Sequence, residues 1–273
     1  MKNIFLIIFF LIFNIIPSIG IELQGPLTQG ALITGKAPLD TAVFIDGRKL
    51  RINEQDGIFV FGFGRDHGLS SKLKIIYPDG RVEIRTLLIN QRKWKIERID
   101  GLPPKKVSPP KSMMRRIKRE VEILNNVRSR DSLRINFVDG FILPTKGRFS
   151  GHYGSQRILN GIARRPHLGL DIAGPIGTPI YAAAGGQVML ASSDLFYTGG
   201  TIVIDHGHGI TTIYSHMNSV EVKVGEYIEQ GNKIGTMGAS GRARGSHLDW
   251  RINWFNIRLD PELVLLGSQK KLK

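Results

Sequence analysis

The chain has 273 residues, of which 41% are hydrophobic and 22% charged, and this composition provides for a sizeable core and excludes disorder throughout. Thirty-eight Lys and Arg outnumber 23 Asp and Glu, which leaves a formal charge of +15 at pH 7. The absence of cysteine excludes disulfides and thiolate-ligated metal sites, so any metal must bind His, Asp or Glu.

Residues 1–20 predict a signal peptide. Lys2 precedes an apolar run from Ile4 to Ile16, and small residues lead to an expected cleavage after Gly20. A membrane anchor that is never removed is the alternative, because the run is nearly long enough to span a bilayer. In either case we expect export. An exported basic chain meets anionic envelope polymers rather than nucleic acid, although the charge could simply solvate the surface.

Residues 21–89 predict a small antiparallel β-sandwich of immunoglobulin-like type. Short apolar runs flank three Asp-Gly pairs, which supply the positive φ angles of tight hairpins. The pairs are Asp46-Gly47, Asp56-Gly57 and Asp79-Gly80. Because this region carries no cluster of His, Ser or carboxylates, we interpret it as a binding or spacer module rather than a catalytic one.

The next two segments connect this module to the rest of the chain. Residues 90–111 carry four prolines among basic residues and predict an extended linker. Residues 112–140 predict one amphipathic helix, with Ser112 as its cap, followed by a connecting strand. The apolar stripe of this helix consists of Met114, Ile117, Val121, Leu124 and Val127.

Residues 141–260 predict a second, mainly β domain of antiparallel strands, and 261–273 a basic C-terminal tail. Short apolar runs alternate here with glycine-rich turns. The expected strands are Thr178–Ala184, Gln187–Ala191, Thr201–Asp205, Ile210–Tyr214, Val220–Val224 and Leu248–Trp254. Six of the seven histidines follow Ser150, so the chemistry is expected in this domain.

Three histidine clusters stand out: His167-Leu-Gly-Leu-Asp171, Tyr214-Ser-His216 and His247-Leu-Asp249. Residues two apart on a strand share a face, which lets His247 and Asp249 address one site and places His216 on the face of Tyr214. His167 and Asp171 would be too far apart on a flat strand, so they must converge through a turned segment. Imidazole and carboxylate are ligands that zinc accepts.

An ordered series of motifs from about Phe149 to Trp254 resembles the M23 family of zinc metallopeptidases, the lysostaphin and LytM type, which cut peptides in bacterial cell walls. Besides the three clusters, the series comprises Gly151-His-Tyr-Gly154, Gly177-Thr-Pro-Ile-Tyr-Ala-Ala183, Ile204-Asp-His-Gly-His-Gly-Ile210, Ile234-Gly235 and Gly238-Ala-Ser-Gly241.

The resemblance implies one zinc ion per chain. The zinc ligands of the family's HxxxD motif correspond to His167 and Asp171, and the family's catalytic histidines correspond to His216 and His247. The family's third ligand is the second His of an HxH pattern, and here Asp249 stands in that position. The added negative charge predicts slower hydrolysis or an altered metal preference.

Four further residues are candidates to line a substrate groove: Tyr153, Tyr214, Arg242 and Arg244. The two arginines could hold an acidic wall peptide. His206 and His208 are interpreted as surface residues of a hairpin tip, and Trp250 and Trp254 as core.

The resemblance implies an exported, periplasmic or envelope-associated bacterial metalloendopeptidase that hydrolyses peptidoglycan peptides in wall remodelling or division. One alternative is a degenerate M23-like module that binds peptidoglycan or activates a wall amidase, with Asp249 as the lesion. In a third reading, the N-terminal module and linker form the main functional surface and contact an envelope protein partner.

Overall fold

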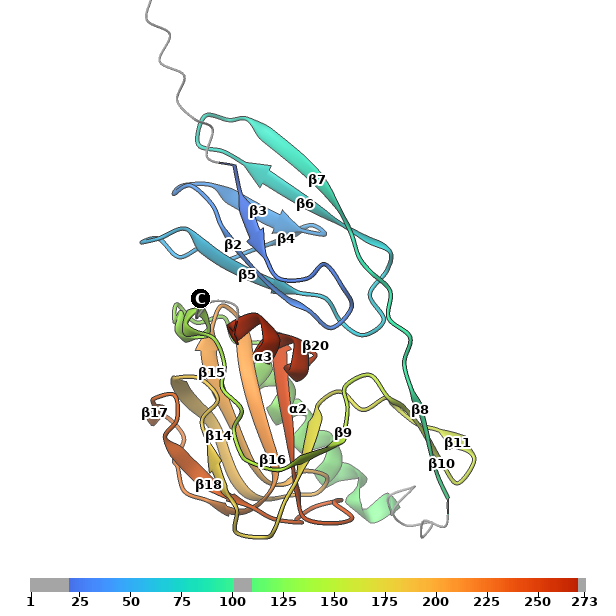
Figure 1. The fold of residues 1–273 in the computed structure, drawn as a ribbon. Helices are drawn as coiled ribbons and strands as arrows, with labels where there is room; N and C mark the ends of the chain where they lie inside the picture. Colours follow the sequence, from blue (N-terminus) through green and yellow to red (C-terminus); the bar gives the residue numbers. More distant parts are fainter. Residues whose placement is uncertain (1–19, 101–109, 270–273) are drawn as a thin grey trace, which may run out of the picture.

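A computed structural model describes residues 20–100 and 110–269 as two β-rich parts joined by an extended segment (Figure 1). The predicted signal peptide and most prolines of the predicted linker lie outside these residues. In the described part of the chain, no helix is both long and apolar enough to cross a membrane. The mainly β, antiparallel fold class is confirmed.

The N-terminal part is built from two small antiparallel sheets, with strand orders β1-β2-β5 and β4-β3-β6-β7. Alternating buried and exposed residues along β6 place Leu73 and Ile75 inside, against Ile33 and Phe59 of the other sheet. The predicted Asp46-Gly47 and Asp79-Gly80 turns connect β3 to β4 and β6 to β7. The strands are β1 (Glu22–Gln24), β2 (Leu32–Lys36), β3 (Ala42–Ile45), β4 (Arg48–Lys49), β5 (Ile58–Gly62), β6 (Ser70–Ile76) and β7 (Val82–Leu88).

Part of the predicted linker is a strand. β8 (Ile96–Ile99) pairs in parallel with β10 (Gln156–Leu159), which in turn pairs with β11 (Ile162–Ala163). These three strands project beside the C-terminal sheet in Figure 1. The linker thus contributes to the periphery of the C-terminal domain, because its backbone groups pair with a strand 60 residues later in the chain.

The predicted helix is present as α2 (Met114–Arg128), but two details differ. Ser112 does not cap it, because a 3₁₀ turn, η1 (Lys111–Met113), precedes the helix. The predicted connecting strand is wrong, since another 3₁₀ turn, η2 (Asn136–Asp139), stands there. Phe137 buries its ring within this turn, and Gly140 ends it with a φ of 85°.

The C-terminal domain holds a ten-stranded sheet whose main path runs β17-β14-β15-β16-β19-β12-β9. β13, β18 and β20 pair off this path. Trp250 and Trp254 are buried as predicted, with exposures of 0% and 3%. The strands are β9 (Arg148–Gly151), β12 (Leu170–Ala173), β13 (Pro179–Tyr181), β14 (Gly186–Leu195), β15 (Gly199–Gly207), β16 (Ile210–Val220), β17 (Tyr227–Ile228), β18 (Lys233–Met237), β19 (His247–Trp254) and β20 (Ile257–Leu259).

Five of the six expected strands overlap β13, β14, β15, β16 and β19. The expected strand Val220–Val224 is wrong beyond Val220, because the chain turns at Gly225, whose φ is 90°.

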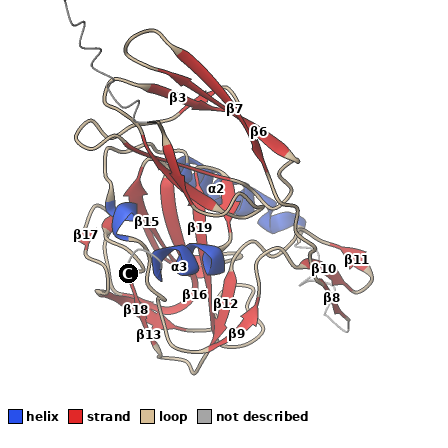
Figure 2. Ribbon diagram, turned by 45° about the horizontal axis from the view of Figure 1, so that its top comes forward, coloured by secondary structure: helices blue, strands red, loops and turns tan. Residues whose placement is uncertain are grey.

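The predicted basic tail begins as a helix, α3 (Pro261–Gln269), so the tail prediction is wrong up to Gln269 (Figure 2). Asp260 starts it by accepting a hydrogen bond from the Glu262 amide at 2.9 Å, and Pro261 suits a first helical turn. Ser268 donates to Val264 and accepts from the Phe141 amide.

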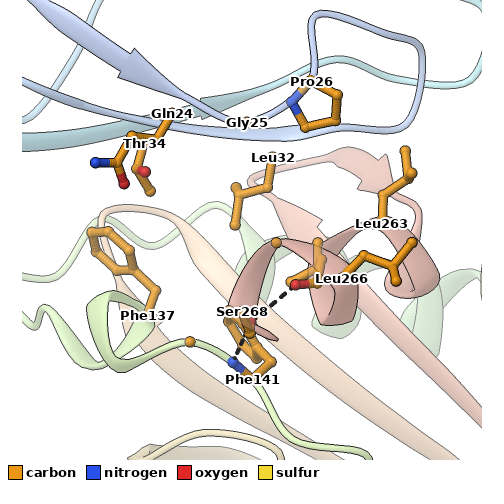
Figure 3. Close-up of a pocket in the computed structure, with 13 residues that line it drawn as sticks. Gln24, Gly25, Pro26, Leu32, Thr34, Phe137, Phe141, Leu263, Leu266 and Ser268 are labelled. Carbon is orange, nitrogen blue, oxygen red and sulfur yellow. Dashed lines mark hydrogen bonds between the residues drawn. The ribbon is translucent and has the colours of Figure 1, made fainter. Parts of the chain in front are cut away.

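The two parts of the protein are in direct contact. Arg92 binds the buried carboxylate of Asp260 at 2.7 Å, and the Arg48 guanidinium lies 3.6 Å from the Phe255 ring centroid. A single buried cluster of apolar residues runs through both parts. Between β1, β2 and α3 the structure leaves a cavity of about 1240 Å³, lined by Leu32 and Leu266 among others (Figure 3).

Candidate metal and catalytic site

The two carboxylates of the predicted metal site face each other across adjacent strands. β12 pairs with β19 so that Asp171 is directly opposite Asp249, and Ala173 opposite His247. A Cβ built on Gly151 of β9 would overlap the Asp171 carboxylate, and one on Gly169 would lie 2.6 Å from Asp249 Oδ1. Only glycine leaves room for both carboxylates at this edge of the sheet.

His167 reaches the same point from the loop before β12. Backbone hydrogen bonds fix this loop: the His167 amide donates to Ser155 and its carbonyl accepts from Gly154. The imidazole is 2% exposed, and its Nε2 lies 3.1 Å from Asp171 Oδ1. The expected convergence of His167 and Asp171 through a turned segment is therefore seen.

His167, Asp171 and Asp249 each offer one ligand atom, and these atoms lie within 4.8 Å of one another. Within the described residues, both His167 ring nitrogens and Asp171 Oδ1 are buried without a hydrogen-bond partner. Buried polar atoms left unpaired are costly unless another group satisfies them. One nitrogen and two carboxylate donors around such unpaired atoms fit a divalent cation such as zinc.

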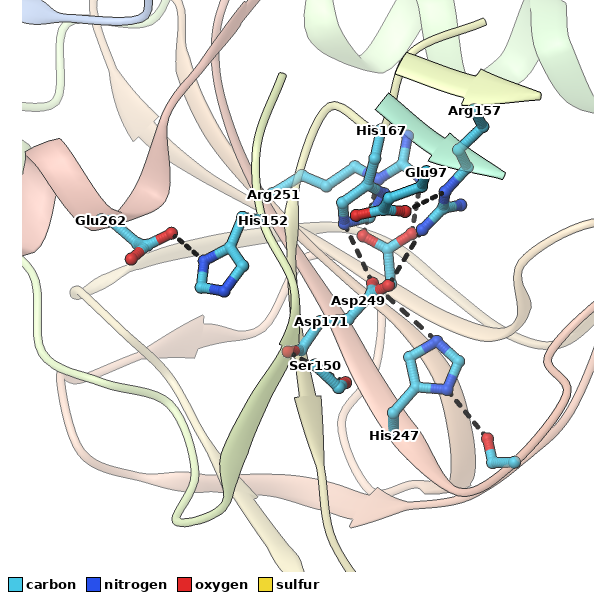
Figure 4. A network of polar contacts seen from close by, with 11 residues as sticks. Glu97, Ser150, His152, Arg157, His167, Asp171, His247, Asp249, Arg251 and Glu262 are labelled. Carbon is cyan, nitrogen blue, oxygen red and sulfur yellow. Dashed lines mark hydrogen bonds and ion pairs between the residues drawn. The ribbon is translucent and has the colours of Figure 1, made fainter. Parts of the chain in front are cut away.

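Two arginines lie against these carboxylates, and sequence reasoning identified neither (Figure 4). Arg251, two residues after Asp249 on β19, donates through Nε to Asp249 Oδ1 at 2.8 Å and through Nη2 to Oδ2 at 2.5 Å. Burial raises the pKa of Asp249, but the charge and hydrogen bonds of Arg251 outweigh it and hold that pKa well below its usual range.

The second arginine, Arg157 of β10, donates to Asp171 Oδ2 at 3.1 Å. Glu97 of β8 approaches the same guanidinium at 3.6 Å. The parallel pairing of β8 with β10 thus places a linker carboxylate beside the metal-ligand candidates, which sequence periodicity gave no means to foresee.

The predicted catalytic histidines lie next to each other, with ring centroids 4.8 Å apart. His216 Nδ1 faces the Ser240 carbonyl and His247 Nδ1 faces the Gly245 carbonyl, each at 2.8 Å. A carbonyl only accepts hydrogen bonds, so in the neutral rings the proton belongs on Nδ1 and Nε2 keeps a lone pair. His247 Nε2 lies 3.9 Å from Asp171 Oδ1.

His216 reaches the site by leaving ordinary strand geometry. Tyr214 pairs with Trp250 on the core face and Ser215 pairs with Asp249 on the site face, so strand alternation alone would turn His216 into the core. A φ of 67° at His216 changes its direction, and the expectation that it shares a face with Tyr214 is wrong. Burial lowers the pKa of His216, which favours its neutral form.

Two groove candidates are corrected. Tyr153 is 3% exposed and donates to the Arg258 carbonyl, while Tyr214 is fully buried and accepts from the Ala183 amide. Neither ring is open to a substrate. Arg242 and Arg244 are exposed in the loop before β19, and Arg242 stacks 4.4 Å from the Tyr197 ring centroid.

His206 and His208 are also not the surface residues that the hairpin pattern predicts. Both are buried, and His206 contacts the Gly185 carbonyl and the Thr212 hydroxyl through its two ring nitrogens. Burial lowers the pKa of each to about 4. They are structural groups of the sheet.

Residues 165–261, which include all five predicted metal-binding and catalytic residues, match the model of peptidase family M23. The C-terminal domain belongs to this family. M23 peptidases are zinc metallopeptidases, and the structure brings His167, Asp171 and Asp249 together in a cluster that could hold a metal ion.

Related M23 proteins come from several bacteria. Peptidoglycan DD-endopeptidase ShyA of Vibrio cholerae is 36% identical over 124 residues, covering 45% of this chain and 28% of ShyA. DD-carboxypeptidase/endopeptidase Mpg of Neisseria meningitidis is 36% identical over 140 residues, covering 48% of this chain and 32% of Mpg. The match therefore spans less than a third of these relatives.

A crystal structure described as a putative M23 peptidase from Pseudomonas aeruginosa is similar over both parts of the protein. Its TM-score is 0.68 at 25% identity, and the match covers 90% of this chain and 97% of that one. The arrangement of an N-terminal β module on an M23 domain thus recurs in a solved structure.

Proposed function

We propose that this protein is an exported zinc metalloendopeptidase that hydrolyses peptide bonds of bacterial peptidoglycan. The observation that carries the proposal is the pairing of two adjacent histidines, His216 and His247, with a buried cluster of one imidazole and two carboxylates. Relatives named as peptidoglycan DD-endopeptidases support the substrate class.

His167, Asp171 and Asp249 would hold the ion, which when bound polarises the scissile carbonyl and a water molecule. His247 and His216 each point Nδ1 at a backbone carbonyl, which fixes the ring and leaves the Nε2 lone pair for the reaction. One imidazole accepts the proton of the attacking water. The imidazolium then stabilises the developing oxyanion and returns the proton to the departing amine.

Arg242 and Arg244 are proposed to contact the substrate. Both are exposed in the loop that leads into His247, and the peptides of a cell wall offer free carboxylates for a guanidinium. The signal peptide belongs to the same proposal, since peptidoglycan lies outside the cytoplasmic membrane. Mature protein that begins at Ile21 in an envelope fraction would support export.

The test is incubation of the purified full-length protein with isolated sacculi, with and without a chelator. We expect release of soluble muropeptides that stops on chelation and returns with added zinc. His167→Ala should release none. Release that persists in metal-free protein would contradict the proposal.

A second candidate is a non-catalytic wall-binding or amidase-activating module. The observation that favours it is that Arg251 engages both carboxylate oxygens of Asp249. This candidate predicts no stoichiometric zinc together with retained binding to sacculi, so metal analysis beside a pull-down separates the two.

A further inference from the structure

Asp249 and Arg251 form a close ion pair at the third ligand position, in which Asp249 is buried and Arg251 is half-buried. Their side chains are 6% and 26% exposed, and two hydrogen bonds join them, one to each carboxylate oxygen of Asp249. Such bidentate pairs are geometrically specific and stronger than single hydrogen bonds. The local packing includes the pair, because a Cβ on Gly169 would lie 2.6 Å from Asp249 Oδ1 and 2.7 Å from Arg251 Cγ.

The net charge of the three metal-ligand side chains indicates a role for the Asp249–Arg251 pair. A neutral histidine, the aspartate of HxxxD and a second neutral histidine carry one negative charge together. Replacing the second histidine by Asp249 adds another negative charge. Arg251 adds one positive charge at hydrogen-bond distance, and so returns the site to the single negative charge of the two-histidine arrangement.

We propose that Arg251 is a positioning residue that makes Asp249 equivalent in charge to the histidine it replaces, so that the two residues act as one metal-ligand unit. The inference rests on the proposed function, because it assumes that the cluster binds zinc. It changes the expectation drawn from the sequence, in which Asp249 appears as an uncompensated charge and a lesion.

The pair need not exclude a metal. Each carboxylate oxygen has two lone pairs, so Asp249 can accept from Arg251 and still offer a lone pair to an ion. Hydrogen-bond partners behind a metal ligand commonly orient it in this manner.

Other charges face Arg251 from neighbouring elements. Asp171 of β12 favours the Arg251 cation. Arg128 of α2 and Arg258 of β20 are cations close enough to oppose it. Asp249 is therefore the main counter-ion of Arg251, and a substitution that removes the Asp249 charge leaves a half-buried, poorly compensated cation beside the metal position.

This gives a prediction that separates a coupled pair from two independent residues. Installing histidine alone, as Asp249→His, should impair zinc binding, because Arg251 then repels the ion without a partner. The double variant Asp249→His/Arg251→Met should restore it. If Arg251 only supports the fold, replacing it should weaken zinc binding both in the native protein and in the Asp249→His variant.

The experiment measures the zinc dissociation constant of the full chain by competition with a chromophoric chelator, for the native protein, Arg251→Met, Asp249→His and the double variant. We expect Asp249→His to bind zinc at least about tenfold more weakly than the double variant. Arg244→Met in the Asp249→His background, which removes an exposed arginine of the loop before β19, is the control and should change the constant less than about twofold.

Because loss of a half-buried, ion-paired arginine can unfold a protein, the polar variant Arg251→Gln is measured beside Arg251→Met, and circular dichroism checks that each variant is folded. If Asp249→His binds zinc as tightly as the double variant, or more tightly, the proposed coupling of Asp249 and Arg251 is wrong. The proposed function still stands in that case, provided that the native protein binds zinc. If the native protein binds no zinc, the proposed function fails and the pair fails with it.

Discussion

The rings of His216 and His247 lie 4.8 Å apart, yet only His247 reaches the site with ordinary strand geometry. His216 is turned toward it by a left-handed backbone with a φ of 67°. Few residues other than glycine adopt this conformation, and those that do are concentrated at functional sites. Substitution of each histidine therefore tests the role of its ring.

Replacing either histidine by asparagine, as His216→Asn or His247→Asn, should retain the hydrogen bond to the backbone carbonyl while deleting Nε2. We expect muropeptide release to fall about 10²- to 10⁴-fold with zinc content unchanged, because only the proton-transfer group is lost. Rates on sacculi and metal analysis check this. His152→Asn, the same change at a half-buried histidine that contacts Glu262, is the control and should leave the rate near native.

Removing the metal should destabilise the protein. His167 and Asp171 keep buried atoms unpaired within the described residues, and a ligand that binds only the folded state adds RT ln(1 + [L]/Kd) to its stability. At 100 times the Kd, zinc should add about 2.7 kcal/mol to the free energy of unfolding. Thermal melts with zinc and with chelator measure this, and identical melting temperatures would count against a metal site.

Gly151→Ala should weaken zinc binding, because the added methyl group overlaps the Asp171 carboxylate and must displace it. A misplaced ligand is expected to cost about 10- to 100-fold in affinity, by comparison with losses of the partners that orient metal ligands. Gly68→Ala, where nothing described lies within 4 Å of the new Cβ, should have no effect. Equal zinc affinity in the two variants would show that Asp171 does not need this space.

Stability should fall as the pH falls from about 6.5 to about 4, in part through His206. Burial lowers the pKa of His206 to about 4, so in this pH range the histidine binds a proton in the unfolded chain but not in the folded chain. The contribution of His206 to the free energy of unfolding is fully present above pH 6.5. Roughly 3 kcal/mol of it is lost by pH 4. In urea unfolding across this range, His206→Gln should be less stable at pH 7 but show a shallower pH slope, whereas a slope equal to the native one would contradict this assignment.

The convergence of the metal-ligand candidates could be predicted because it depends on local spacing. His247 and Asp249 share a face two residues apart, and the bend that brings His167 to Asp171 follows from Gly169 and Pro166. Arg251 could have been found by the same alternation, since it is two residues beyond Asp249, but a basic residue on a strand ordinarily points to solvent.

Other features depend on contacts that no local pattern contains. Tyr153 and Tyr214 look available in the sequence, but distant backbone groups at Arg258 and Ala183 hold their hydroxyls in the interior. The direction of His216 depends on one backbone angle. Arg157 comes to Asp171 only because β10 forms a separate small sheet with a strand of the linker.

That small sheet bears on how the protein can be divided. The segment matching the M23 family begins at residue 165, whereas β8, with Glu97 beside Arg157, lies almost 70 residues earlier. A truncated protein that starts at the family boundary would lack β8 and β10, and with them the arginine that contacts Asp171. The smallest piece that preserves the site as a whole therefore starts upstream of Ile96, and domain swaps among relatives should exchange the linker strand together with the C-terminal domain.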